Sequence, residues 1–328
     1  MYFNSPPDAI ADTPAFEMDG LRRGEADEYI IEIRKGESAQ SVGHRLEQAG
    51  LIRSRHFWYW YSRYSKDFIK TGTYRLEIPA SQMAIHGILA SGRQILIRVT
   101  IPEGVTLKKT AKILEDSGIC LAQDFLDAAV DPAIIESYSI PNTSMEGYLF
   151  PDTYLFPESF PAPQTLRLMA DNFFKRLNEL DIPIKNLSPE ELNRAVIIAS
   201  IVEREYRINE EAPKMAGVFF NRLRIGMALQ SCATVAYIIT EIQDKPNPEV
   251  LYHRDLEIRN PYNTYIMPGL PPGPISSPGI IALDAVFNPE QNDYLYFRLN
   301  DVSSGKHYFS RTLDEHIRAG QLMLKSQP

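Results

Sequence analysis

The longest apolar stretch of the chain predicts a helix that is buried on every side. Residues 195–202 are apolar or small at every position, so no amphipathic stripe can be drawn around them. Ser188 with Glu191 three residues later forms a capping box, and Pro189 occupies the first helical position, where its missing N–H does no harm. The pattern therefore predicts a helix that starts after Ser188 and carries Glu203 at its end in dry surroundings.

Shorter patterns predict further helices and a hairpin. Apolar side chains recur at helical spacing from about residue 163 to 178 and again from about 209 to 223. Ser231 and Thr234 suit the start of a short helix that runs to Thr240. The remaining signals are a helix start at Ser277-Pro278, a hairpin of residues 294–299 and 307–310, and a capping box of Thr312 and Glu315 for the last helix.

A strand, a glycine turn and a glycine-capped helix occur twice when the chain is shifted by 68 residues. The shift aligns Gly36 with Gly104 and Gly50 with Gly118, and each helix stops at the later glycine, as a left-handed C-cap requires. Two small α+β modules are the economical interpretation. Chance similarity between two capped helices is the alternative.

Two aromatic segments are candidates for binding. Residues 260–279 contain six prolines and three glycines with tyrosines between them, which predicts an ordered, stiff loop along a groove rather than a linker. Trp58-Tyr59-Trp60-Tyr61 with Tyr64 forms a cluster that suits either a core or a sugar-stacking platform. Because aromatic side chains dominate cores, we favour the core for this cluster.

The length of 328 residues and a hydrophobic content of 44% predict a globular α+β protein with real cores. We expect a tether or the edge of a trimmed chain over residues 1–27 and small α+β modules over 28–98 and 99–144. A larger mixed α/β domain, with a helical core and a C-terminal β-hairpin, is expected over 145–328.

Charge and composition exclude several classes of function. A net charge of -8, without a basic stripe, argues against nucleic acid as a partner. No apolar run approaches the roughly 20 residues that a membrane helix needs, and no signal peptide is visible. Cys120 and Cys232 lie far apart, and the six histidines lack ligand spacing, so we expect no metal and no cofactor.

Glu203 has the surroundings of a general acid. Apolar packing and the negative end of a helix both favour a proton on its carboxyl group at neutral pH. A catalytic acid needs that proton. The alternative is that Glu203-Arg204-Glu205 is only the solvated last turn of a structural helix, and from this segment alone both interpretations stay open.

Several segments, taken together and in order, resemble the endolytic murein transglycosylase (YceG-like) family. They are Glu146–Tyr154 (EGYLFPDTY), Ala199–Glu205 (ASIVERE), Phe220–Leu223 (FNRL), Met227–Ser231 (MALQS), Tyr262–Tyr265 (YNTY), Gly269–Ile275 (GLPPGPI) and Tyr294–Phe297 (YLYF). The resemblance covers nearly the whole chain from about residue 28.

The resemblance implies an enzyme that cuts glycan strands of nascent peptidoglycan internally, between N-acetylmuramic acid and N-acetylglucosamine. Glu203 matches the catalytic glutamate of the family, which acts first as acid and then as base while the C6 hydroxyl of the muramic acid closes an anhydro ring. The resemblance also implies a LysM-like module over 28–98 and a catalytic domain over 145–328. It places the protein on the periplasmic side of the bacterial inner membrane, held by one N-terminal helix.

The implied partners are peptidoglycan glycan strands and cell-wall synthases. By resemblance, the substrate groove is lined by Glu146, Tyr148, Asp152, Tyr154, Gln230, Ser231, Thr234, Tyr262, Asn263, Thr264 and Tyr265. Tyrosine faces suit sugar rings, and amides and hydroxyls suit sugar hydroxyl groups. Asn263 and Thr264 equally suit pure turn chemistry.

Two departures from the family pattern keep other functions open. Cys232-Ala233 replace the usual Asp-Pro, and the membrane helix is missing, which favours a trimmed chain over a relative without an anchor. One rival function is a glycan-binding scaffold for cell-wall synthesis that has lost turnover. The other is a hydrolytic muramidase in which Asp152 or Glu205 activates water.

Overall fold

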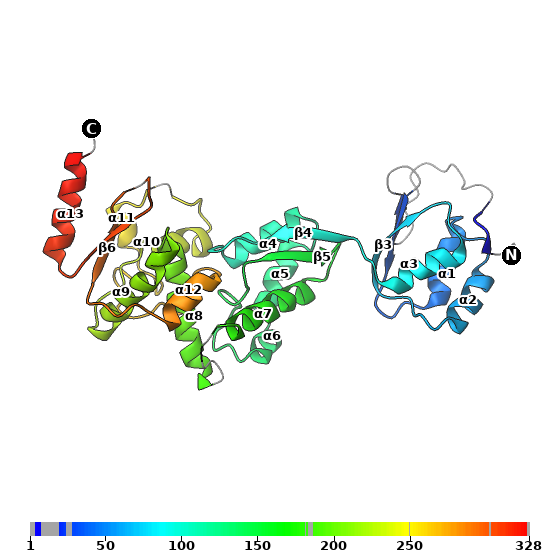
Figure 1. Ribbon diagram of the computed structural model, residues 1–328, viewed down its shortest axis with the longest axis horizontal. Coiled ribbons are helices and arrows are strands. Elements are labelled where there is room, and N and C mark those ends of the chain that lie inside the picture. Colours follow the sequence, from blue (N-terminus) through cyan, green and yellow to red (C-terminus); the bar gives the residue numbers. More distant parts are fainter. Residues whose placement is uncertain are drawn as a thin grey trace. The chain divides into compact units, whose positions relative to one another are not determined.

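The computed structural model describes residues 4–7, 20–23, 28–180, 182, 186–248, 250–301 and 303–326. The chain forms two compact units (Figure 1). The first comprises Met1–Arg98 and Leu155–Ser159, and the second Val99–Tyr154 and Phe160–Pro328. The segment 99–144, predicted as a module of its own, thus lies within the larger unit. Of the predicted tether, Leu21–Arg23 form a strand, and most of the rest lies outside the described residues.

The first unit packs helices against an antiparallel sheet. Its described elements are β1 (Leu21–Arg23), β2 (Glu28–Ile33), α1 (Ala39–Gln48), α2 (Arg55–Tyr64), β3 (Gly72–Glu77) and α3 (Gln82–Ser91). β2 lies between β1 and β3, with Ile31 opposite both Leu21 and Tyr74. These three side chains are buried in one core with Leu46 of α1 and Leu89 of α3.

The aromatic cluster of α2 divides between core and surface. Trp58 is fully buried, donates its indole N–H to the carbonyl of Ala39 at 2.8 Å and contacts the ring of His86. Trp60 and Tyr64 are 52% and 78% exposed, and their rings stack on each other. The predicted core role is therefore correct for Trp58 and wrong for Trp60 and Tyr64, because one helix face points inward and the other outward.

The second unit is mainly helical. Its elements are α4 (Leu107–Asp116), α5 (Ala122–Ala129), α6 (Pro132–Ser137), α7 (Ala162–Asn178), α8 (Pro189–Glu205), α9 (Ala212–Arg224), α10 (Cys232–Tyr237), α11 (His253–Leu256), α12 (Ile280–Phe287), β6 (Tyr296–Leu299), β7 (His307–Ser310) and α13 (Leu313–Ser326). A short 3-10 turn, Asn209–Glu211, precedes α9, and a π-helical turn, Ile238–Ile242, follows α10. β4 (Leu96–Thr100) pairs with β5 (Thr153–Pro157) in a separate sheet. The chain passes from one unit to the other within each of these two strands.

The predicted buried helix is α8. Every residue from Val196 to Val202 is buried, and the helix packs against α9 and α12 (Figure 1). Both hydrogen bonds of the capping box between Ser188 and Glu191 are present, as the sequence predicts. Helices combined with small separate sheets make this an α+β fold.

Both copies of the predicted repeat form a strand, a turn and a helix: β2 with α1, and β4 with α4. Gly36 and Gly104 in the turns, and Gly50 and Gly118 after the helices, have φ between 68° and 79°. Glycine adopts this left-handed conformation without the steric cost that a Cβ atom adds.

Candidate active site around Glu203

α8 delivers Glu203 at its last turn, where a loop from far along the chain docks. Ser200, fully buried one turn earlier, accepts the backbone N–H of Ile275 on its hydroxyl at 3.0 Å. The hydroxyl of Ser276 donates to the carbonyl of Ser200 at 3.0 Å. A small polar residue at position 200 therefore seats the end of the proline-rich segment against the helix, and residues 273–279 are buried.

The docked loop supplies a hydrogen bond to the Glu203 carboxylate. The backbone N–H of Gly279 donates to Oε2 at 2.9 Å, and the hydroxyl of Tyr206 donates to Oε1 at 3.3 Å. The turn that contains Gly104 lies against the same side chain, since a Cβ atom on Gly104 would stand 3.6 Å from Cγ of Glu203. This turn is joined to the loop by two backbone hydrogen bonds, from Gly104 to Ser277 at 2.9 Å and from Ser277 to Val105 at 2.8 Å.

These surroundings favour the protonated form of Glu203. Burial raises the pKa of Glu203 to about 7, and the negative charge of nearby Glu103 acts in the same direction. The hydrogen bonds from Gly279 and Tyr206 stabilise the carboxylate and limit the rise. Near neutral pH, Glu203 is therefore poised between proton donor and proton acceptor.

Glu205, on the same turn, has different partners. The hydroxyl of Ser231 donates to its carboxylate, so Ser231 makes no side-chain cap to α10 and the predicted cap is wrong at this position. Burial raises the pKa of Glu205 as well. Thr264 accepts the N–H of Ser231 at 3.0 Å, and its hydroxyl pairs with that of Thr234 at 2.9 Å, so all three predicted hydroxyl residues belong to one buried web.

Gln230 and the tyrosines of the YNTY segment surround this web. Gln230 is exposed, with φ of 49°, and donates its N–H to the carbonyl of Thr264. Tyr262 and Tyr265 are half-buried, and the hydroxyl of Tyr265 lies 3.0 Å from Sγ of Cys232. Asn263 is fully buried and donates to the carbonyls of Leu256, at the end of α11, and Ile258, while its own side-chain oxygen accepts the N–H of Tyr265. These contacts fit the turn chemistry that the sequence allows.

Glu146 and Tyr148 make structural contacts inside the unit. Both carboxylate oxygens of Glu146 accept the N–H of Leu107 at 3.2 Å, at the start of α4. Glu146 is 6% exposed, and burial raises its pKa to about 8. Tyr148 is 1% exposed and donates its hydroxyl to Asn193 of α8 at 2.9 Å.

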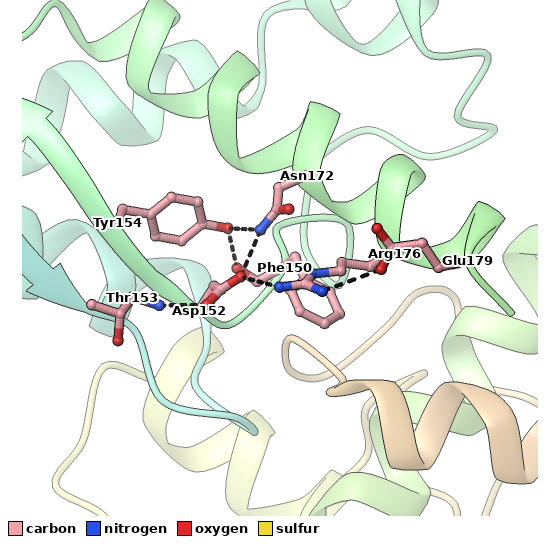
Figure 2. A network of polar contacts seen from close by, with 7 residues as sticks. All are labelled: Phe150, Asp152, Thr153, Tyr154, Asn172, Arg176 and Glu179. Atoms are coloured by element: carbon pink, nitrogen blue, oxygen red, sulfur yellow. Dashed lines mark hydrogen bonds and ion pairs between the residues drawn. The ribbon is translucent and has the colours of Figure 1, made fainter.

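Asp152 and Tyr154 are held in a polar network with α7, shown in Figure 2. One oxygen of Asp152 accepts hydrogen bonds from Asn172 at 3.2 Å and Arg176 at 3.1 Å. Asn172 also reaches the hydroxyl of Tyr154, which donates to the carbonyl of Phe150 at 2.6 Å. Burial acts to raise the pKa of Asp152, but the hydrogen bonds outweigh it and lower the pKa. These contacts tie the start of β5 to α7.

The structure thus separates the predicted site residues by exposure. Among them Gln230 is exposed, Glu203, Asp152, Tyr262 and Tyr265 are half-buried, and the other seven are buried. Sequence reasoning missed Glu103, Tyr206 and Gly279, the neighbours that set the pKa of Glu203. Only Tyr206 left a local signal, three residues after Glu203, whereas Glu103 and Gly279 reach the site through the fold.

The described residues contain neither a metal-binding cluster nor a membrane-spanning helix. Among them, no group of three or more His, Cys, Asp and Glu side chains is arranged to hold a metal ion. None of the helices in the described ranges has both the length and the apolar character to cross a membrane.

Comparison with known proteins identifies relatives along nearly all of the chain. The model of the YceG-like family matches residues 31–321. An endolytic murein transglycosylase of Streptococcus pneumoniae (strain D39) is 31% identical over 318 residues, which cover 88% of this chain and 57% of that protein. The enzyme of the same name from Bacillus subtilis (strain 168) is 30% identical, covering 90% of this chain and 85% of that protein.

The fold has a relative among solved structures. The crystal structure of a YceG-like protein from Listeria monocytogenes matches with a TM-score of 0.57 and 30% identity, covering 89% of this chain and 98% of that one. The chain spans only 57% of the length of the pneumococcal relative. The family match nevertheless extends through both units, and the chain belongs to the YceG-like family.

Proposed function

We propose that this protein is an endolytic lytic transglycosylase that cleaves peptidoglycan glycan strands between N-acetylmuramic acid and N-acetylglucosamine. Membership of the YceG-like family supports the substrate class, because curated relatives at about 30% identity are named endolytic murein transglycosylases. The observation that carries the proposal is the half-buried carboxyl group of Glu203, whose pKa is raised to about 7.

In the proposed reaction, one carboxyl group serves two steps. Protonated Glu203 donates its proton to the glycosidic oxygen, and the bond from that oxygen to C1 of the muramic acid breaks. The carboxylate then accepts the proton of the C6 hydroxyl, whose oxygen bonds to C1 and closes the 1,6-anhydro ring. The internal hydroxyl replaces the water and the second carboxylate of ordinary glycosidases. A pKa near 7 suits a group that must both donate and accept a proton.

The neighbours of Glu203 support this cycle. The N–H of Gly279 fixes one oxygen at 2.9 Å, so the carboxyl group is held in place before the sugar arrives. The hydrogen bond from the hydroxyl of Tyr206 lowers the pKa of Glu203, and the negative charge of Glu103 raises it. The two effects oppose each other. No metal or cofactor takes part in the proposed reaction.

We propose that exposed Gln230 and half-buried Tyr262 and Tyr265 contact the glycan, since their amide and ring surfaces suit sugars. The buried members of the predicted set would hold the frame around them. We further propose that the protein acts on the outer face of the inner membrane, where peptidoglycan is built, and alongside cell-wall synthases. The LysM-like nature of the first unit stays a prediction.

The test is the mass of the products released from purified peptidoglycan. Products that end in 1,6-anhydro-muramic acid are expected, because the reaction consumes no water. Reducing ends would instead identify a hydrolytic muramidase, and bound but uncut strands would identify a scaffold. Glu203→Gln is expected to lower the rate by about 100-fold or more, since 100-fold is the lower end of the range for loss of a general acid.

The matched control is Glu205→Gln, which alters the other carboxylate of the same turn. In the proposal, the pairing of Glu205 with Ser231 is structural. The Glu205→Gln variant should therefore retain far more activity than Glu203→Gln. Equal rates for Glu203→Gln and the parent would end the assignment of Glu203.

A further inference from the structure

A cavity lined by arginines lies beside the last turn of α8. Its volume is about 490 Å³. Its basic side chains come from α8 and the loop after it, from α9, from the hairpin β6–β7 and from α13. We call it the arginine pocket, defined by Arg204, Arg207, Arg222, Arg298, His307 and His316. Four guanidinium groups around one cavity contrast with the net charge of -8 of the chain.

The positive charge of this pocket is poorly neutralised. None of its arginines takes part in the ion pairs found among the described residues. The lining contains one carboxylate, Glu205, which accepts the hydroxyl of Ser231. The charges of Arg204 and Arg222 act on Glu205, but neither arginine forms a direct ion pair with it. A second carboxylate nearby, Glu211, is paired with the ring of His307 at 2.7 Å.

Among the described residues, two buried polar atoms of the pocket residues have no hydrogen-bond partner. They are Nε of Arg298 and Nδ1 of His316. Leaving a buried donor without a partner costs about 1–3 kcal/mol, and more for a charged group. Arg298 is also closely confined, because a Cβ atom on Gly320 would overlap its guanidinium group. Arg298 therefore keeps donor capacity that none of its described neighbours satisfies.

Arg222 is held rigidly in the same wall. It is 6% exposed, donates to the carbonyls of Leu295 and Leu229, and lies over the ring of Tyr296 at 5.4 Å. A guanidinium group that is fixed before binding loses little entropy when it meets an oxyanion. The planar donor fork of arginine matches both oxygens of a carboxylate.

We propose that the arginine pocket binds a carboxylate of the murein strand. This inference rests on the proposed function. Arg204, which lines the pocket, follows Glu203 directly in α8, and its guanidinium group donates to the carbonyl of Gly104, whose turn also lies against Glu203. Gln230 and Tyr265, which we propose to contact the glycan, line the pocket as well, so the pocket adjoins the proposed substrate site. The muramic acid at the cut bond carries a lactyl group, which is a free acid in bare glycan and bears the acidic peptide stem in murein. The pocket thereby selects strands that carry these acids.

The experiment measures binding to the full-length Glu203→Gln chain, so that cleavage does not interfere. The probes are a murein tetrasaccharide with its peptide stems, the same compound with its carboxylates converted to amides, and a bare tetrasaccharide with free lactyl acids. The acidic stem compound is expected to bind at least about tenfold more tightly than the amide, the lower range for hydrogen bonds to a charged group. This preference should decrease as salt is added.

The variants Arg298→Gln and Arg207→Gln, each in the Glu203→Gln chain, should remove most of this preference while keeping the affinity for the amide. Arg207 is exposed, so its replacement should leave the fold intact even if Arg298→Gln does not fold. The control Arg254→Gln removes the same charge from a side chain that is 82% exposed and outside the pocket, and it should keep the full preference.

Each remaining result is decisive. Tight binding of the bare tetrasaccharide would assign the site to the lactyl acid, and tight binding of the stem compound alone would assign it to the peptide. Equal affinity for acid and amide would overturn the inference. If the parent chain prefers the acid but releases no anhydro products, the inference survives and the proposed function fails. If the parent chain cleaves acid and amide strands equally well and binds them equally, the proposed function survives and the inference fails.

Discussion

At the scale of single residues, the last turn of α8 shows how two nearby carboxyl groups acquire different chemistry. Burial raises the pKa of both Glu203 and Glu205. Glu205 is occupied by the hydroxyl of Ser231. Glu203 faces a backbone N–H, a phenol and the charge of Glu103. Two residues apart on a helix, the side chains point in nearly opposite directions and meet different parts of the chain.

The pH dependence of activity follows from these neighbours. The acid form of Glu203 is needed for the first step, and it is lost as pH rises through its pKa of about 7. We expect kcat/KM to fall above pH 7 and to approach a tenfold loss per pH unit. Glu103→Gln removes a negative charge and should move this fall to lower pH. Tyr206→Phe removes a hydrogen bond to the carboxylate and should move it to higher pH, by about one unit or less.

These shifts are read from rate profiles between pH 5 and pH 9. The two variants must move the alkaline limb in opposite directions if Glu203 is the group that titrates. A parent profile that stays level from pH 6 to pH 9, or two variants that shift together, would contradict the assignment.

At the scale of elements, the proline-rich segment is held by several separate parts of the unit. Ser200 of α8 accepts one of its N–H groups, and Val105 pairs with Ser277. Gly147 supplies a third contact. Its φ is 83°, and a Cβ atom there would stand 2.4 Å from Cβ of Pro274, closer than atoms can approach.

Gly147→Ala tests this packing, with Gly118→Ala as its matched control. Both glycines have positive φ, but no atom of the described residues lies within 4 Å of a Cβ atom on Gly118. Both variants should lose about 1–2 kcal/mol of folding stability to backbone strain. Gly147→Ala should lose about 1–3 kcal/mol more to the clash, and activity as well, because Gly279 belongs to the same segment. Urea unfolding and product assays measure the two effects, and equal losses for both variants would exclude the clash.

Local chemistry explains which elements the sequence could predict. The capping boxes of α8 and α13 need only residues three positions apart, and both are present. The sequence predicts that the hydroxyl of Ser231 caps α10, and this is wrong because the hydroxyl donates to Glu205 of another helix. The predicted groove residues include both buried structural residues and more exposed ones for the same reason. The contacts of Asp152 with α7 and of Glu146 with α4 depend on tertiary packing, which the sequence alone does not show. The buried position of Glu203 could be predicted because a capped apolar helix is itself a local signal, and its catalytic role stays a prediction.

At the scale of the whole molecule, the two units respond to pH in opposite senses. Glu146 and Glu203 of the second unit have pKa values raised to about 8 and about 7. A raised carboxyl pKa stabilises the fold at low pH, and this contribution is lost as pH rises through the folded value. In the first unit, burial lowers the pKa of His86, which lies against Trp58. That neutral imidazole stabilises the fold above about pH 6.5 and less so as pH falls.

The tryptophans make this difference measurable. The chain has 2 of them, Trp58 and Trp60, and both lie in the first unit. Tryptophan fluorescence should therefore follow the unfolding of the first unit, whereas circular dichroism follows the helices of both. Between pH 7 and pH 9 we expect the fluorescence transition to stay in place. The main dichroism transition should move to lower temperature, by a stability loss of about 2 kcal/mol.

Glu146→Gln provides the control for this experiment. The amide oxygen still accepts the N–H of Leu107 but carries no charge, so the alkaline loss of stability should shrink. A fluorescence transition that follows the dichroism transition at every pH would instead mean that the two units unfold as one.

The first unit is interrupted in the sequence, since Leu155–Ser159 belong to it and Val99–Tyr154 do not. During synthesis, its final segment leaves the ribosome only after the chain has begun the other unit. At about 5–20 residues per second, this delay lasts on the order of 3–12 seconds. Arg22 pairs with Glu158, 136 residues later, so this contact can form only about 7–27 seconds after Arg22 is made. A chaperone that captures the nascent chain in this interval would meet a first unit without its last segment.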